Sequence, residues 1–324
     1  MMIIGLTFDL QSEYLAEGFT AEEAAEFDKE ETIEGIEKSL QRLGHETIRI
    51  GNVKRLTERL ANGERWDLVF NICEGVYGIG REAQVPALLD AYRIPYTFSD
   101  PLVLSLTLHK GIMKRVVRDL GVATPDFALI STPADIATIT LPFPLFLKPV
   151  AEGSGKAITG KSLVHDRKEL EEQALHLLSV FHQPVLTECF LPGREFTTGI
   201  IGTGEEAAAL GTMEIVYNEH VKKKIYSYEV KNEYEKFVTY RIPEAEICEQ
   251  CAKLALTVWK GIGGRDAGRI DIRLDEQGTP NFIELNPLAG MNYIHSDLPI
   301  IAYKHNLTYD DLMKKIIGSA IQRI

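Results

Sequence analysis

Two short runs near the carboxyl end combine apolar residues with acids, arginines and an amide at alternating positions. They span residues 268–275 and 281–287, and the residue types from Asp275 to Gly278 favour a tight turn between them. The pattern therefore predicts a hairpin. Because successive side chains of a strand point to opposite faces, one face would carry Arg269, Asp271 and Arg273 from the first strand, and Phe282, Glu284 and Asn286 from the second.

The oxygen atoms on that face suit a metal ion. Asp271, Glu284 and Asn286 offer hard ligands of the kind that hold Mg²⁺ (or Mn²⁺) between a few protein oxygens and substrate phosphates. Arg269 beside them would stabilise phosphate charge. The alternative is the solvent face of an edge hairpin, where alternating polar residues are common. The apolar, glycine-bearing loop 288–291 that follows favours the metal site, because such a loop is unusual on a surface.

A triphosphate at such a site needs positive partners, and the middle of the chain supplies them. Lys148 lies in an otherwise apolar strand, where a charge requires a partner, unless the amine reaches solvent from an edge strand. The glycines of the loop 152–156 would let backbone N–H groups approach phosphate oxygens, and Ser154 adds a hydroxyl donor. The loop does not match G-x-x-x-x-G-K-[ST], so a P-loop NTPase is not supported. Further on, the strand–turn–strand segment 186–195 could present its backbone to a purine, with Glu195 near the ribose.

The elements around these residues predict a fold of the α/β (α+β) class. Over the first hundred residues strands and helices alternate, which is typical of a parallel, Rossmann-like sheet flanked by helices. Strands are expected at 2–7, 47–50 and 66–71, helices at 33–43 and 83–92, and a short extended piece at 94–97. After a boundary near residue 105, helices are expected at 109–121, 166–182, 244–260 and from Tyr309, and strands at 144–150, near 162, 184–190, 195–202, 208–216 and in the hairpin.

Charge and composition narrow the function classes. The net charge of -12 disfavours nonspecific binding to nucleic acid or anionic membranes, which requires clustered Lys and Arg, so small-molecule partners are expected. No apolar run is long enough to span a bilayer and no leader pattern is present, which predicts a cytoplasmic protein. Cys248 and Cys251 fall inside a helical pattern, so a partly buried helix face is favoured over zinc or redox chemistry. In the acidic stretch 13–37 a solvated face is favoured over a cation or substrate site, with Glu13 as the candidate exception.

Together these segments resemble the ATP-grasp superfamily, and within it the D-alanine:D-alanine ligase group, over most of the chain from Pro86 onward. The resemblance implies a Rossmann-like domain at 1–105, a central ATP-grasp subdomain at 106–191 and a metal-binding subdomain at 192–324. It implies that ATP is held by Lys110, Lys148 and Lys231, by the loop residues Glu152, Gly153 and Ser154, and by Glu188, Cys189, Leu191 and Glu195 of the hinge. It assigns the metal and the transition state to Arg269, Asp271, Glu284, Asn286 and Gly290.

The departures from the family concern the substrates. Family ligases carry a Gly-Gly-x-Ser-x-Glu loop after the first strand, for which Glu13 is only a loose substitute. The His-Gly after the third strand is replaced by Cys73-Glu74-Gly75, and the second serine of the phosphate loop by Gly155. Ser296, one residue later than expected, remains a candidate for a substrate carboxylate. ATP chemistry is unaffected by these changes.

The sequence therefore predicts an ADP-forming carbon–nitrogen ligase. A carboxylate would attack the γ-phosphoryl group of ATP, and an amine would then attack the acyl phosphate, with the Gly290 N–H and Arg269 stabilising the oxyanion. Two alternatives remain open: a true D-alanine:D-alanine ligase of cell-wall precursor synthesis, and a noncatalytic nucleotide-binding regulator. The substrates would be a small carboxylate and a small amine, and the resemblance makes a homodimer a candidate assembly.

Overall fold

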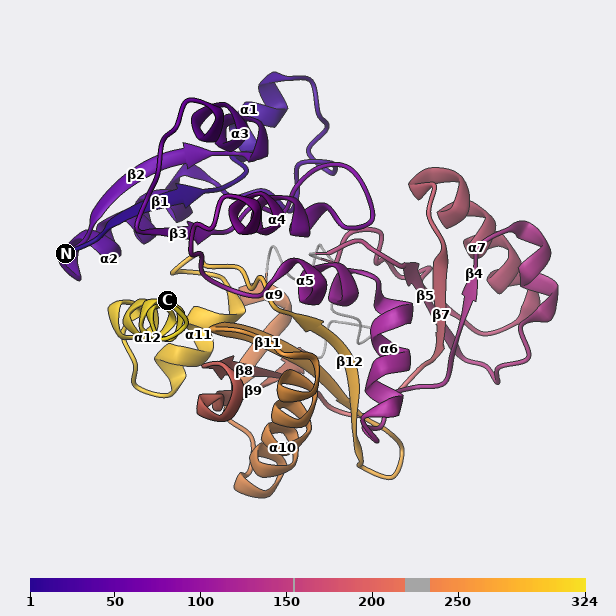
Figure 1. The fold of residues 1–324 in the computed structure, drawn as a ribbon. Coiled ribbons are helices and arrows are strands. Elements are labelled where there is room, and N and C mark those ends of the chain that lie inside the picture. The colour runs from indigo at the N-terminus through magenta and orange to yellow at the C-terminus, as the bar shows by residue number, and fades with distance from the viewer. Residues whose placement is uncertain (154, 219–233) are drawn as a thin grey trace.

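The computed structural model describes residues 1–153, 155–218 and 234–324 of the chain. Ser154 and Lys231, both expected to contact phosphate, lie outside these residues. Within the described part the chain forms three sheets, with strand orders β2-β1-β3, β4-β7-β5-β6 and β10-β9-β8-β11-β12. Figure 1 shows the first sheet above the third, and the second to one side of both. No helix among the described residues has the length and apolar character that crossing a bilayer would require.

The first sheet is parallel, as the alternating pattern predicted. Its strands are β1 (Ile3–Thr7), β2 (Glu46–Gly51) and β3 (Leu68–Asn71), and Tyr96 adds a single bridge to Val69. The helices of this part are α1 (Gln11–Ala16), α2 (Glu30–Arg42), α3 (Val53–Ala61) and α4 (Gln84–Ala91), preceded by a 3-10 turn at Arg81–Ala83. Ile33, Ile36 and Leu40 are buried along one face of α2, which explains the predicted helical spacing.

The second sheet is antiparallel and carries Lys148 on an internal strand. Its strands are β4 (Phe127–Ile130), β5 (Leu145–Pro149), β6 (Leu163–Val164) and β7 (Val185–Cys189). The helices are α5 (Pro101–Leu108), α6 (Lys110–Asp119) and α7 (Arg167–Phe181), with a 3-10 turn at Pro133–Thr138. α5 was not predicted, and the expected boundary near residue 105 lies inside it. β5 lies between β7 and β6, so Lys148 cannot reach solvent from an edge strand.

The third sheet carries the predicted hairpin. It consists of β8 (Glu195–Ile201), β9 (Ala208–Tyr217), β10 (Val238–Arg241), β11 (Ala267–Leu274) and β12 (Pro280–Asn286), with a 3-10 turn at Gly204–Glu206. Its helices are α9 (Tyr234–Phe237), α10 (Ala245–Ile262), α11 (Asp297–Lys304) and α12 (Tyr309–Ile321). β10, α9 and α11 were not predicted. Trp259 of α10 packs with Ile270 and Ile272 of β11, and Cys251 is fully buried on the same helix.

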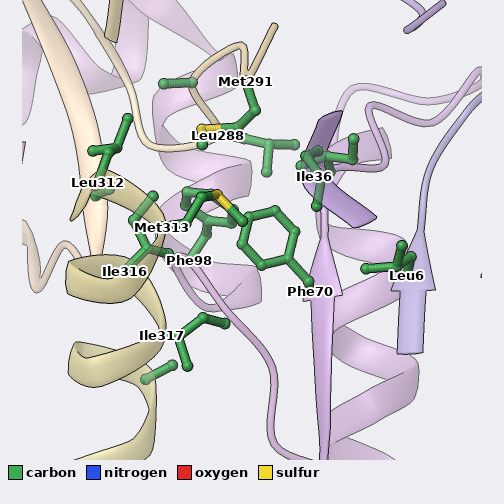
Figure 2. Close-up of a cluster of buried hydrophobic side chains, with 14 of the residues drawn as sticks. Leu6, Ile36, Phe70, Phe98, Leu288, Met291, Leu312, Met313, Ile316 and Ile317 are labelled. Carbon is green, nitrogen blue, oxygen red and sulfur yellow. The ribbon is translucent and has the colours of Figure 1, made fainter. Parts of the chain in front are cut away.

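One hydrophobic core joins the beginning of the chain to its end. Leu6 of β1, Ile36 of α2 and Phe70 of β3 belong to the same buried cluster as Met313 and Ile316 of α12. Figure 2 shows Phe70 next to Met313, with Leu288 and Met291 above them and Leu6 further to the right. The loop that follows β12 is therefore held against the first sheet. This contact fixes one wall of the candidate site.

Candidate active site

The hairpin brings the predicted oxygen ligands together across two strands. In the antiparallel pairing of β11 with β12, Asp271 lies opposite Glu284 and Arg269 opposite Asn286. The register shifts between Asp271 and Ile272, so that Ile272 pairs with Phe282. The acid, the amide and the arginine thus share one face over the part of the hairpin that precedes this shift.

The shift makes one sequence prediction wrong. Phe282 was expected on the polar face with Glu284, but it is buried in the core beside Ile272. Ile283 instead lines a cavity next to Glu284. A β-bulge inserts one extra residue into a strand, which reverses the alternation of faces on one side of it. No residue type in this stretch signals the bulge.

Asp271 is held by three neighbours. Its carboxylate forms an ion pair with Arg269 and accepts hydrogen bonds from the Thr197 hydroxyl at 2.9 Å and the Asn286 amide at 3.5 Å. Burial raises the pKa of Asp271, and the Arg269 guanidinium only partly offsets that effect. Asp271 would therefore gain from a divalent cation that adds positive charge beside it.

Two lysines from much earlier in the chain keep Glu284 ionised. Its Oε2 lies 3.8 Å from Lys110 Nζ and 3.7 Å from Lys148 Nζ. Burial alone would raise the pKa of Glu284, but Lys110, Lys148 and Arg269 outweigh it and hold that pKa at about 2. A carboxylate with this pKa is available to a metal ion at any physiological pH. The structure therefore brings Lys110 and Lys148 to the same carboxylate as the hairpin face.

Local sequence explains how both lysines point into the site. Leu145 and Leu147 of β5 are buried in the hydrophobic core between the second sheet and α7. The alternate residues Phe146 and Lys148 therefore face the other side of the sheet. Lys110 opens α6, where the His109 ring accepts the backbone N–H of Ile112 at 3.2 Å. That cap fixes the start of the helix and with it the position of Lys110.

A third lysine was missed by the sequence reasoning. Lys114 is fully buried, with its amine 2.7 Å from Glu188 Oε2, and it donates to the Thr124 hydroxyl at 2.7 Å. Glu188 also lies 3.1 Å from Lys148 through Oε1, so it joins the two amines. Burial would raise the pKa of Glu188, but the two lysines lower it. The spacing of four residues between Lys110 and Lys114, which places both on one helix face, was the available signal.

The loop expected to cover the phosphates is fixed at its start by the first part of the chain. Lys110 donates to the Glu152 carbonyl at 2.6 Å, and the Gly153 N–H donates to Glu26 Oε1 at 2.6 Å. Arg81 pairs with Glu26 at 2.9 Å and donates to the Ala151 carbonyl at 2.7 Å. Glu26 belongs to the acidic stretch that was interpreted as a solvated face, and for this residue the interpretation is wrong. Its partner, Arg81, lies 55 residues further along, so no local pattern identified it.

Two cavities meet at the hairpin, because Arg269 and Glu284 line both. We call the one where the sequence places the nucleotide the nucleotide-side cavity; it is lined by, among others, Lys148, Glu188, Cys189, Leu191, Glu195 and Asp271. We call the one where the sequence places the substrate the substrate-side cavity; it is lined by, among others, Lys110, Gly153, Asn286, Gly290 and Ser296. Glu195 accepts from the Tyr217 hydroxyl at 2.6 Å and lies 3.3 Å from Arg273. All of the described candidate residues except Glu13 and Glu152 are among those lining these two cavities.

Glu13 stands apart from the other candidates. Its carboxylate pairs with Arg55 of α3 at 2.9 Å, and it is not among the residues that line either cavity. Ser296, in contrast, lies in the substrate-side cavity, where its hydroxyl accepts the Asn292 N–H at 3.0 Å. It sits directly beside Gly290, since a Cβ added there would lie 2.8 Å from the Ser296 hydroxyl. The Gly290 N–H and the Ser296 hydroxyl thus belong to one corner of the cavity.

The donor set fits a magnesium ion shared with phosphate. No group of three or more His, Cys, Asp or Glu side chains within the described ranges has the geometry to hold a metal. Asp271 and Glu284 nevertheless face each other across the hairpin, with the Asn286 side chain on the same face. Mg²⁺ is commonly bound by one or two carboxylates and completed by substrate phosphates and water. Two carboxylates and an amide suit that mode of binding.

In sequence and in fold, the chain is similar to known D-alanine--D-alanine ligases. A family model described as "D-ala D-ala ligase C-terminus" matches residues 116–318. A D-alanine--D-alanine ligase of Aquifex aeolicus is 34% identical over 289 residues, covering 88% of this chain and 93% of the relative. One of Bordetella petrii is 33% identical over 276 residues, covering 84% and 80%. The crystal structure of the Bacillus anthracis enzyme complexed with ATP superposes with a TM-score of 0.75 at 22% identity, covering 100% of this chain and 98% of that chain.

Proposed function

This chain belongs to the D-alanine--D-alanine ligase family, and we propose that it joins a small carboxylate to a small amine where its two cavities meet. The members of this family are ATP-dependent, ADP-forming carbon–nitrogen ligases. The family membership confirms the resemblance found in the sequence. The observation that carries the proposal is the convergence on Glu284. Lys110 and Lys148, from two separate elements, lie within 4 Å of this carboxylate, and Asp271 faces it across the hairpin. Cations for a triphosphate and oxygens for Mg²⁺ therefore occupy one place.

In the proposed reaction ATP lies between the central and the third subdomain. The adenine and ribose occupy the nucleotide-side cavity at Glu188 to Leu191 and Glu195, and the phosphates reach Lys110 and Lys148. Asp271, Glu284 and Asn286 would hold Mg²⁺, which supplies charge neutralisation to the phosphates. We retain the division at 1–105, 106–191 and 192–324 as the framework for this arrangement, although the first and third parts share a core.

The chemistry follows from positioning and charge. An oxygen of the substrate carboxylate attacks the γ-phosphorus, the bond to the β-phosphate oxygen breaks, and ADP leaves. The amine then attacks the carbonyl carbon of the acyl phosphate, loses a proton, and inorganic phosphate leaves. Arg269 lies at the junction of the cavities and Gly290 lines the substrate-side cavity, so their N–H groups would stabilise the developing oxyanion. Gly153 and the covering loop would exclude water from the intermediate.

D-alanine is the first candidate for both substrates, because it is named in the relatives. The second candidate is a pair of substrates other than two D-alanines. The residues that line the substrate-side cavity favour this second candidate. Glu13 is turned to Arg55, and Glu74 lines the cavity where family ligases carry His-Gly. The proposed reaction uses cytoplasmic ATP. A homodimer is the assembly we would test first, by light scattering.

An assay of ADP formation with a panel of D- and L-amino acids, each offered alone and in pairs, tests the proposal. Turnover with D-alanine alone supports the first candidate, and turnover with another pair supports the second. Arg269→Met should lower kcat by about 10²–10³-fold with either, the usual cost of removing an oxyanion donor. Arg42→Met, at an exposed pair with Asp310, is the matched control and should keep full activity. ATP binding without ADP formation on any pair would refute ligation and indicate a noncatalytic nucleotide-binding protein.

A further inference from the structure

The wall of the substrate-side cavity that comes from the first part of the chain is acidic. It contains Glu26, Asp28, Glu74 and Glu82, which we call the acidic wall. Two separate segments supply it, one before α2 and one between β3 and α4. The opposite wall is the loop after β12, with Gly290, Asn292 and Ser296, together with Asp297 at the start of α11. A substrate in this cavity therefore lies beside four acidic residues.

The four carboxylates differ in whether they already have a partner. Glu26 is neutralised by Arg81 at 2.9 Å, with both side chains less than a tenth exposed. The Asp28 carboxylate accepts a hydrogen bond from Thr32. The carboxyl groups of Glu74 and Glu82 have neither a hydrogen bond nor an ion pair with any residue that the structure describes. These two are the side chains that remain for a ligand.

The electrostatics of the two free carboxyl groups indicate a missing positive charge. Burial, together with repulsion from Glu82 and Glu26, raises the pKa of Glu74 well above its usual range. Burial also raises the pKa of Glu82 to about 7, and Arg81 offsets this only in part. A cation close to a buried carboxyl group lowers its pKa. A ligand that brings a cation would remove the penalty at both positions.

A second, independent observation comes from the opposite wall. Asp297 is only 4% exposed, and its Oδ1 has no hydrogen-bond donor within the described part of the chain. Its Oδ2 lies 3.6 Å from Arg269 Nε. A buried acceptor without a donor costs roughly 1–3 kcal/mol, and Asp297 is among the residues that line this cavity, so its carboxyl group would gain from a donor on the ligand.

A metal ion explains the acidic wall less well than an amine does. Among the described residues no three carboxylates or imidazoles are grouped as metal ligands would be, and the acidic wall is included in that statement. An ammonium group needs no such convergence, because it can donate to acceptors spread over several ångströms of a wall. The chemistry of the wall therefore selects a protonated amine.

Building on the proposed ligase function, we propose that the substrate seated in this cavity is a diamino acid, with a cationic side-chain amine against Glu74 and Glu82. The α-amino group would then lie toward the unsatisfied Asp297 oxygen, and the carboxylate toward Arg269 and Lys110. A plain aliphatic amino acid would leave Glu74 and Glu82 unpaired. This is the feature that distinguishes the cavity from one suited to alanine.

Isosteric pairs of amino acids test this directly. Ornithine and norleucine differ by an ammonium in place of a methyl group, as do diaminobutyrate and norvaline. In the ADP-formation assay, with each compound offered in both D and L forms and with alanine as partner, kcat/KM for the diamino acid should exceed that of its isostere by at least about tenfold. Calorimetric titration of ornithine and norleucine into the protein with ADP and Mg²⁺ gives the same comparison without turnover.

Variants identify the residues responsible. Glu74→Gln and Glu82→Gln should each raise KM for the diamino acid by about tenfold and leave KM for ATP unchanged, since one unit of charge interaction is lost. Glu172→Gln, at an exposed pair with Lys168 on α7, is the control. Thermal melting verifies that each variant is folded, and replacing a buried carboxyl group that has no partner should not lower the melting temperature.

The outcomes separate this inference from the proposed function. Turnover on alanine or norleucine that equals turnover on ornithine overturns the diamino acid but leaves the ligase intact. Unchanged discrimination in both Glu variants overturns the role of the acidic wall. If no pair yields ADP, the ligase proposal fails, and the titration still decides whether ornithine binds in preference to norleucine.

Discussion

Replacing Lys114 by methionine should lower the free energy of unfolding by about 3 kcal/mol, because it leaves a buried carboxylate without one of its two cations. Methionine keeps the length of the side chain and removes the charge. The Lys114 amine lies 2.7 Å from Glu188, and both side chains are at most 5% exposed. After the substitution Glu188 keeps, among the residues that the structure describes, only the ion pair with Lys148 at 3.1 Å.

The magnitude follows from the geometry. At 2.7 Å and an effective dielectric constant near 20, the Coulomb attraction is about 6 kcal/mol. Several kcal/mol of desolvation cost disappear with the Lys114 charge, so the net loss is smaller than the attraction. Breaking a buried pair usually costs about 3–5 kcal/mol, and the remaining Lys148 places this case at the lower end.

Urea unfolding of Lys114→Met, Glu188→Gln and the double variant measures the effect. The double variant should be about 2 kcal/mol more stable than the sum of the single losses predicts, since the two residues interact directly. Lys168→Met, in an exposed pair with Glu172, should change stability by less than about 0.5 kcal/mol. Additive losses, or a Lys114→Met protein as stable as the wild type, would refute the electrostatic reasoning.

Two further predictions concern the hinge and the metal face. Gly193→Ala should lower the free energy of unfolding in urea by roughly 1–3 kcal/mol, because the new Cβ would lie 2.4 Å from the Leu274 carbonyl oxygen, which cannot move easily. Gly318→Ala in α12 is the control and should be neutral or stabilising, because a Cβ there meets nothing within 4 Å. Equal losses of stability in both variants would contradict the steric explanation. Glu284, whose pKa is lowered from 4.5 to about 2, stabilises the fold when ionised, so that contribution is complete above pH 4.5 and is lost as the pH falls toward 2. The stability difference between wild type and Glu284→Gln should therefore shrink over this range, and a constant difference would show that the lysines do not act on Glu284.

Local patterns were sufficient to predict most of the elements. The spacing of Ile33, Ile36 and Leu40 predicted α2, and the alternation along 269–274 predicted β11. These patterns are reliable because each element buries one face, so its apolar residues recur with the period of a helix or a strand. Short elements such as α9, β10 and α11 were not predicted, because a few residues do not establish a period.

The periods of strands and helices predicted Asp271, Glu284 and Lys148, and the structure brings them together. Lys110 and Gly290 were named from the family resemblance instead. Lys114 shares a helix face with Lys110, but its role and that of Arg81 depend on partners from other elements, Glu188 and Glu26. The placement of Phe282 failed because the bulge shifts the register without a local sequence signal.

By itself, the sequence determined the alternation of elements, the hairpin with its acids, and the lysines that would meet a triphosphate. Only the tertiary structure decided which carboxylates are neutralised, since that depends on contacts such as Glu26 with Arg81, 55 residues apart. It likewise decided that Glu13 faces Arg55 while Glu74 and Glu82 line the cavity. The residue type sets the charge of a side chain, but the electrostatic free energy of that charge depends on its burial and on its distances to other charges. Burial and distances are both set when distant segments pack together.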